Sequence, residues 1–200
     1  LNLARVFLRE GRLDDAVAAL GRAASHDPPA PVWTVLWFTG LVNRQNGYLD
    51  EAIENFRDLI ELDTEETRRR GFDFSQDYRV HDALGQALFD RAKQERGDDR
   101  RARREALLEE AATAYRRALE FDPENRTAHY GLSRVLEQLG DEPGAREHRA
   151  LHARYRPDDN ARDRIVSEAR RRYPAANHAA EAVVVYDLRR DGAYGLPAGR

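Results

Sequence analysis

The chain has 200 residues, enough for one ordinary globular domain or a short stack of small repeats. Hydrophobic residues make up 41% and charged residues 34%, and a net charge of −3 gives no reason to expect general attraction to nucleic acid or anionic lipid. Cysteine is absent, which excludes disulfides, cysteine–zinc sites, thiol catalysis and CxxCH haem attachment within this sequence, and no apolar run approaches the ~20 residues that a membrane helix needs.

The start of the sequence limits what can be said about its origin. Methionine is absent and the first residue is Leu1, so we expect a fragment or a processed product. No secretory n-region and h-region is visible at the start. A signal could lie upstream, so the compartment stays open.

One short pattern recurs four times along the chain. Ala16, Ala52, Ala111 and Ala145 are each followed 12 residues later by Pro28, Thr64, Pro123 and Pro157, respectively. A small residue lets two helices approach closely, and a proline stops the second helix. Because one helical hairpin cannot bury its apolar face alone, the repeats predict stacked hairpins with all four alanines buried at helix–helix contacts.

This pattern resembles the tetratricopeptide repeat, a unit of ~34 residues that forms two antiparallel helices. The resemblance covers residues 1–157, and in the first copy it rests on Leu3, Ala4, Phe7, Gly11, Ala16, Leu20, Ala23 and Pro28. The second and fourth copies depart from it where Thr39, Asn43, Arg149 and His152 replace apolar residues. The resemblance implies an all-α fold, a right-handed superhelical solenoid of antiparallel helix pairs with about four units and C-terminal capping helices.

The units are expected at about 1–30, 31–66, 78–125 and 126–157. In the third unit Gly85 and Ala111 are 26 residues apart, whereas the equivalent residues of the first two units are 12 apart. Dividing the excess of 14 residues equally would add about two turns to each helix. The spacing therefore predicts an extended hairpin over residues 85–111, with Gly97 near its tip.

Two segments fall outside the repeats. Residues 67–77 predict an ordered loop insert that is anchored by Phe72 and Phe74, with Ser75 capping the next helix. After the last repeat, residues 158–190 predict capping helices, and residues 191–200 a loose tail. Their apolar positions are Ala161, Ile165, Ala169 and Tyr173, followed by Ala179, Ala182, Val183 and Tyr186. The run 183–186 would suit a helix or a strand.

The resemblance also places the first helix of each unit along a concave groove. By the repeat register, the candidate partner-binding residues are Arg5, Trp37, Leu41, Arg44, Gln86, Phe89, Tyr130 and Arg134, with Leu8 and Asp82 beside them. Aromatic anchors among arginines are typical of peptide-recognition surfaces, and arginine holds carboxylates bidentately, so we expect a protein or peptide partner with acidic or aromatic segments. The alternative is that these aromatic residues pack against neighbouring helices.

Some members of the family grip a C-terminal carboxylate with lysine and asparagine at set groove positions. Here Thr34, Phe38 and Arg79 stand at the positions where that clamp would be sought, so the clamp is not reproduced.

The histidines suggest a metal only weakly. His148 and His152 are four residues apart on one expected helix, but no third ligand is evident, and a partly exposed helix face is the favoured interpretation. His81 and His129 occupy the aromatic position of the repeat and are expected to pack. His178 would face a haem only if the chain belonged to a larger multihaem protein. We therefore predict no cofactor and no metal.

Charge is unevenly distributed along the chain. Residues 50–66 hold eight acids and one arginine, whereas residues 91–104 hold seven bases and three acids. The basic stretch would lie at the tip of the extended hairpin, where it could dock an acidic partner or the acidic helix of a neighbouring copy, although such runs are usually solvated faces.

No phosphate-binding loop, nucleophile elbow or paired-carboxylate pocket can be placed on this pattern, so no enzyme is expected. We interpret the chain as a non-catalytic scaffold that binds a partner protein or another domain of its own chain. Two alternatives stay open: a self-assembling structural module, and an accessory domain of a redox, multihaem cytochrome-like protein.

Overall fold

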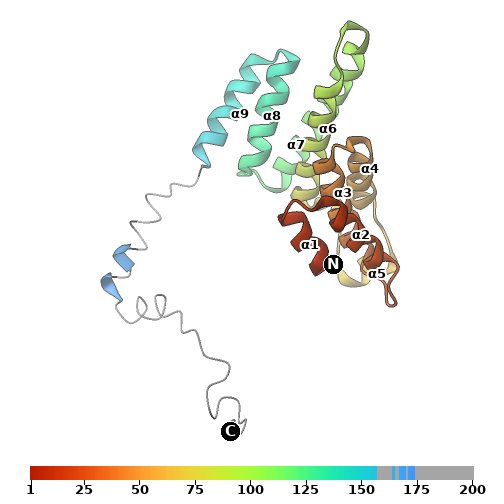
Figure 1. Cartoon of the computed structure of the whole chain (residues 1–200). Coiled ribbons are helices and arrows are strands. Elements are labelled where there is room, and N and C mark those ends of the chain that lie inside the picture. The colour runs from red at the N-terminus through yellow and green to blue at the C-terminus, as the bar shows by residue number, and fades with distance from the viewer. Residues whose placement is uncertain (157–163, 165–166, 170, 174–200) are drawn as a thin grey trace, which may run out of the picture. The chain divides into compact units, whose positions relative to one another are not determined.

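The computed structural model describes residues 1–156, 164, 167–169 and 171–173, and every regular element in these residues is a helix. Four antiparallel pairs follow one another in residues 1–156 (Figure 1): α1 (Asn2–Arg9) with α2 (Leu13–Ala24), α3 (Val32–Asn46) with α4 (Leu49–Ile60), α6 (Tyr78–Gln94) with α7 (Arg101–Phe121), and α8 (Arg126–Leu139) with α9 (Glu142–Arg154). The second helix of each pair contacts the first helix of the next. The predicted all-α helical-repeat solenoid is confirmed.

The described helices carry no stretch with both the length and the apolar character needed to cross a membrane.

The four repeat alanines are buried, as the spacing predicts. Each is 0% exposed where the two helices of its pair meet. Bulky side chains follow four residues further on in the second and third units. Phe56 packs against Gly40 of its own pair, and Tyr115 lies between Gly85 of its own pair and Gly131 of the next. Gly47 and Gly140 end α3 and α8 in the left-handed backbone region, at φ of 84° and 82°, where glycine reverses the chain at low steric cost.

Replacing Ala111 with leucine should overpack the α6–α7 pair. Three added carbons have no room at a fully buried position, so we expect the free energy of unfolding to fall by about 1–3 kcal/mol. Chemical denaturation followed by circular dichroism measures this. Thr113→Leu, on the exposed side of the same helix, is the matched control and should change stability by less than about 0.5 kcal/mol. Equal stability of both variants would contradict the helix register.

The third pair is the longest, but its extra residues are not divided equally. α6 continues to Gln94, nine residues past Gly85, whereas α3 ends six residues past Gly40. α7 begins ten residues before Ala111, whereas α4 begins three residues before Ala52. The remaining residues form a longer connection with a single 3-10 turn, η2 (Asp98–Arg100). The expectation of two added turns on each helix is therefore wrong, because Glu95 ends α6 early.

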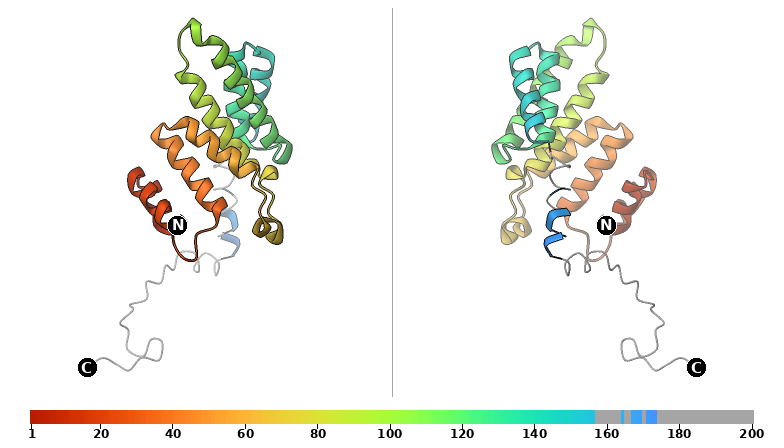
Figure 2. Two further views of the ribbon diagram at one scale, coloured as in Figure 1. Left: turned by 90° about the vertical axis from the view of Figure 1, so that its right-hand side faces the viewer. Right: turned by 90° about the vertical axis from the view of Figure 1, so that its left-hand side faces the viewer.

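Gly97 lies in this connection with φ of 93°, at the end of the hairpin that extends beyond the neighbouring helices (Figures 1 and 2).

Glu95 explains why α6 stops where it does. This carboxylate is only 2% exposed and makes ion pairs with Arg91 (2.7 Å), Arg103 (3.2 Å) and Arg100 (3.5 Å). Its backbone leaves the helical region at ψ of 96°, which turns the chain toward η2. The basic stretch at the hairpin tip thus surrounds a buried acid, and several of its arginines are neutralised within the hairpin.

The insert between the second and third units is more regular than the expected loop. Residues Glu65–Arg70 form a short helix, α5, and Phe74–Gln76 a 3-10 turn, η1. Thr64 and Thr67 form a reciprocal capping box: the Thr67 amide donates to the Thr64 hydroxyl (3.2 Å), and the Thr64 amide donates to the Thr67 hydroxyl (2.9 Å). This cap, and the left-handed Gly71 at the end of the helix, make residues 65–70 helical.

The expectation that Ser75 caps the next helix is wrong. The Asp77 carboxylate accepts the Arg79 amide at 3.0 Å and caps α6, while the Ser75 hydroxyl donates to Asp73. Because η1 takes up residues 74–76, Ser75 lies inside that turn, and Asp77 is the residue next to the first turn of α6.

Most of the predicted capping helices and the tail lie outside the described residues, including Ala161, Ile165 and the whole of residues 174–200. Of the expected apolar stripe, Ala169 and Tyr173 are described, and both are exposed.

Candidate protein-binding groove

The first helices of the pairs lie side by side, and α3 and α6 hold most of the candidate residues. α3 contacts α1 and α6, and α6 contacts α8. Trp37, Leu41 and Arg44 lie on α3, and Gln86 and Phe89 on α6, all half-buried. We call the surface between these two helices the α3–α6 groove.

An apolar cavity opens at the N-terminal end of the α3–α6 groove. Its volume is about 190 Å³, and it is lined by Trp33, Thr34, Trp37, Leu59, Phe74, Asp77, Arg79 and Val80. This volume is below the ~300–1,000 Å³ of small-molecule pockets. The cavity therefore fits a single side chain better than a whole metabolite.

The insert builds one wall of this cavity around Trp33. Phe72 meets the indole edge-on at a ring separation of 5.6 Å, and Phe74 lies 6.3 Å away. The Arg70 guanidinium sits over the same ring at 5.5 Å. Phe72 and Phe74 thus anchor the insert as the sequence suggested, and the residue they anchor to is Trp33, which sequence reasoning missed. The four-residue spacing of Trp33 and Trp37, which puts both on one helix face, was the signal for it.

Charge at the mouth of the cavity comes from Asp77 and Arg79. The Arg79 guanidinium donates to both carboxylate oxygens of Asp77, at 2.9 and 2.6 Å. Burial acts against the charged form of Asp77, but the side-chain and backbone hydrogen bonds from Arg79 outweigh it and lower the pKa of Asp77. The Arg79 side chain remains 66% exposed, so part of its guanidinium group faces solvent.

The C-terminal end of the groove is basic. Arg44 pairs with Asp90 at 3.2 Å, and Lys93 pairs with the other oxygen of Asp90 at 2.5 Å. Arg96 joins them in lining a cavity of about 590 Å³ with Gln45, Asn46, Gly47, Leu49 and Gln94. Three cations and one carboxylate therefore line this cavity, which leaves an excess of positive charge there.

Between the two ends, Asp82 is largely buried in the floor of the groove. Burial raises the pKa of Asp82 to about 6, although the hydrogen bond from Gln86 and the charge of Arg44 act in the opposite direction. Its Oδ1 atom has no hydrogen-bond partner among the described residues. Tyr115 lies beneath, and burial raises the pKa of its phenol too, with the nearby Asp82 and Asp90 charges adding to the effect.

Asp82 gives a prediction for the pH dependence of stability. A carboxyl whose pKa is higher in the folded state, about 6 against an ordinary 3.8, stabilises the fold when protonated and lowers stability when ionised. Asp82→Asn should therefore be more stable than the wild type by about 3 kcal/mol above pH 7. The difference should shrink as the pH falls from 6 to 4. Urea denaturation at several pH values tests this, and a difference that does not change with pH would contradict it.

The structure places the remaining candidates away from the α3–α6 groove. Arg5 lies on α1 with its guanidinium 5.9 Å from the Phe38 ring. Tyr130 lies on α8, half exposed, beside the His152 ring, and Arg134 pairs with Glu137 at 3.5 Å.

The fourth pair holds contacts of His129, His148 and His152, and His81 contacts the end of the insert. The Pro123 carbonyl can only accept a hydrogen bond, so His129 Nε2 donates to it (3.0 Å). A neutral imidazole has one N–H, so His129 Nδ1 accepts the hydrogen bond from His148 Nδ1 (2.9 Å) when both rings are neutral. Burial and the neighbouring His129 lower the pKa of His148. His152 bonds the Arg126 carbonyl, and His81 bonds the Ser75 carbonyl. The described residues hold no group of three potential metal ligands, and His178 lies outside them.

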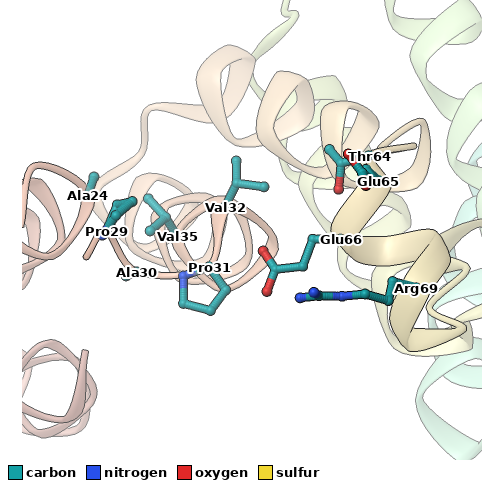
Figure 3. Close-up of a pocket in the computed structure, with 10 residues that line it drawn as sticks. All are labelled: Ala24, Pro29, Ala30, Pro31, Val32, Val35, Thr64, Glu65, Glu66 and Arg69. Atoms are coloured by element: carbon teal, nitrogen blue, oxygen red, sulfur yellow. The ribbon is translucent and has the colours of Figure 1, made fainter. Parts of the chain in front are cut away.

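A third cavity, of about 720 Å³, lies between the α2–α3 connection and α5 (Figure 3). Figure 3 shows Glu66 and Arg69 projecting from α5 toward Pro31. The rest of its lining consists of alanines, valines, prolines, Thr64 and Glu65, and no aromatic side chain lines it. Aromatic anchors dominate protein-recognition sites, so the α3–α6 groove is the stronger candidate.

Stacked antiparallel pairs with a groove along their first helices define the class of helical-repeat interaction scaffolds. Residues 1–67 match a family model described as "Tetratricopeptide repeat", and residues 108–140 match one described as "TPR repeat". The chain belongs to the tetratricopeptide repeat family.

Solved structures agree on the fold. A crystal structure of MamA superposes with a TM-score of 0.57 at 20% identity, over 78% of this chain and 76% of that chain. MamA MSR-1 gives 0.55 at 19% identity, over 80% and 76%, and MamA AMB-1 gives 0.51 at 21%, over 77% and 69%. No curated protein matches the chain. At these identities the likeness concerns the fold alone.

Proposed function

We propose that this tetratricopeptide repeat protein is a non-catalytic scaffold that holds a segment of a partner protein in the α3–α6 groove, with one apolar or aromatic side chain in the Trp33–Trp37–Phe74 cavity. The observation that carries the proposal is this cavity, which is the size of a side chain and is walled by three aromatic rings.

The chemistry of the groove supports a protein ligand. Trp37 is half-buried and contacts Phe56 at a ring separation of 5.8 Å, so the core holds the indole in place while part of it faces the cavity. A rigid aromatic wall loses little conformational entropy on binding. The exposed part of the Arg79 guanidinium is available for a carboxylate or a backbone carbonyl of the bound segment.

Trp37→Ala tests the proposal. Removing a wall of an anchor pocket should weaken partner binding at least 30-fold, since truncating an aromatic hot spot typically costs 2 kcal/mol or more. The partner would be recovered by pull-down from the source organism and titrated calorimetrically against the variant, well below its melting temperature. Arg44→Ala should weaken binding by a smaller factor.

Val17→Ala is the control, because Val17 is an exposed apolar residue on α2 that lines neither cavity of the groove. It should leave the affinity unchanged. If folded Trp37→Ala and Arg44→Ala proteins recover the partner as well as the wild type does, the binding surface lies elsewhere.

A further inference from the structure

Both departures from the repeat pattern add residues to the same groove. The insert supplies Phe74, Asp77 and the loop that surrounds Trp33, all at the N-terminal end. The lengthening of the third pair carries α6 past the end of α3 and supplies Lys93 and Arg96 at the C-terminal end. An ordinary repeat would lack both the aromatic wall that Phe74 adds to the cavity and the basic end.

The distance between the two ends follows from helix geometry. Trp33 and Trp37 precede Arg44 by 11 and 7 residues on α3, which corresponds to about 16 and 10 Å at ~1.5 Å per residue. An extended peptide advances ~3.3 Å per residue. A side chain in the cavity and a side chain at the basic end would thus belong to residues about three to five positions apart.

Charge complementarity decides which chemistry fits the basic end. Asp90 is shared between Arg44 and Lys93, and Arg96 makes no ion pair with any described residue. A carboxylate there would add charge-assisted hydrogen bonds where cations are in excess, whereas a basic group would be repelled.

We infer that the α3–α6 groove recognises an extended acidic segment of a partner protein, in which an aromatic or large aliphatic residue enters the Trp33–Trp37–Phe74 cavity and a Glu or Asp three to five residues away binds Arg44, Lys93 and Arg96. This inference rests on the proposed function and specifies the partner motif for the same groove.

The chain provides its own probe, because Trp33 and Trp37 are its only tryptophans and both line the cavity. Three capped Ser/Gly peptides, each with one Phe and one Glu, would be titrated into the protein up to millimolar concentration. In these peptides the Phe and the Glu are one, four and eight positions apart, respectively. The readouts are the two indole N–H resonances and intrinsic fluorescence. The four-residue spacing should bind about fivefold more tightly than the other two, and replacing Glu by Gln in that peptide should abolish the advantage.

Protein variants separate the two ends. Lys93→Ala with Arg96→Ala should remove the spacing preference while the Phe-dependent indole shifts persist. Arg101→Ala, whose partner Glu105 lies on the same exposed helix turn, should leave the preference intact. Indole shifts of equal strength for all spacings would overturn the inference and leave the proposed function standing. If neither indole responds to any of the peptides, both are overturned.

Discussion

Gly131→Ala is expected to lower the free energy of unfolding by about 3 kcal/mol, at the upper end of the ~1–3 kcal/mol typical of overpacked cores. Gly131 lies on α8 directly against Tyr115 of α7, and an added Cβ would overlap the phenol ring. The ring has little room to move, because it also packs closely against Gly85 on α6, where an added Cβ would lie about 3.0 Å from it. One tyrosine thus packs between two glycine positions on the helices that flank it.

Gly21→Ala is the matched control for this substitution. It makes the same chemical change inside α2, where no atom lies within 4 Å of the added Cβ. Replacing a helical glycine by alanine there should stabilise the protein by about 0.5–1 kcal/mol. The two variants should therefore shift urea denaturation curves in opposite directions. A Gly131→Ala protein as stable as the wild type would show that the α7–α8 contact is looser than described.

Glu95→Gln is the second substitution with a large expected effect. It leaves Arg91, Arg100 and Arg103 without their shared carboxylate, and Arg91 is only 13% exposed. Breaking a buried pair by removing one partner costs about 3–5 kcal/mol, but two of these arginines can turn to solvent, so we expect about 2–3 kcal/mol. Asp50 still pairs with Arg91 at 2.8 Å and limits the loss.

Hydrogen exchange distinguishes where that loss occurs. Since the Glu95 contacts lie within the hairpin tip, amides of residues 90–105 should lose protection before the rest of α6 and α7. Glu105→Gln removes an exposed partner of Arg101 and should change stability by less than about 1 kcal/mol. Unchanged protection around residue 95 would mean that the ion pairs do not hold the tip.

Repeat spacing was sufficient to predict the architecture, because the residues that determine how the helices pack recur at fixed spacings within each repeat. A small residue, a bulky residue four positions later and a stop signal define each hairpin, and all three are local features of the sequence. The four alanines are buried as the spacing predicted, and Gly47 and Gly140 reverse the chain between the helices of their pairs. The longer third hairpin was equally visible, because residue counting between Gly85 and Ala111 needs no knowledge of the partner helices.

The site was only partly visible in the sequence. Register reasoning selected Trp37, Leu41, Arg44, Gln86 and Phe89, and α3 and α6 bring these residues together. Register reasoning could not predict that Phe74 lines the cavity. Phe74 lies in the insert, which is outside the repeats, so the repeat pattern gives no position for its side chain relative to Trp33. Nor could register reasoning show that Arg44 already forms an ion pair with Asp90.

By itself, then, the sequence determined the helical pairs, their order and the extended hairpin, since these depend on periodicity and on spacing within single units. Only the tertiary structure decided how the added residues are used: Glu95 buried among three arginines, Phe72 and Phe74 closed over Trp33, and Lys93 set beside Arg44. The physical reason is that burial and ion pairing depend on which side chains of different helices meet. Arg44 and Lys93 are 49 positions apart in the sequence, and they line one cavity only after the pairs have stacked.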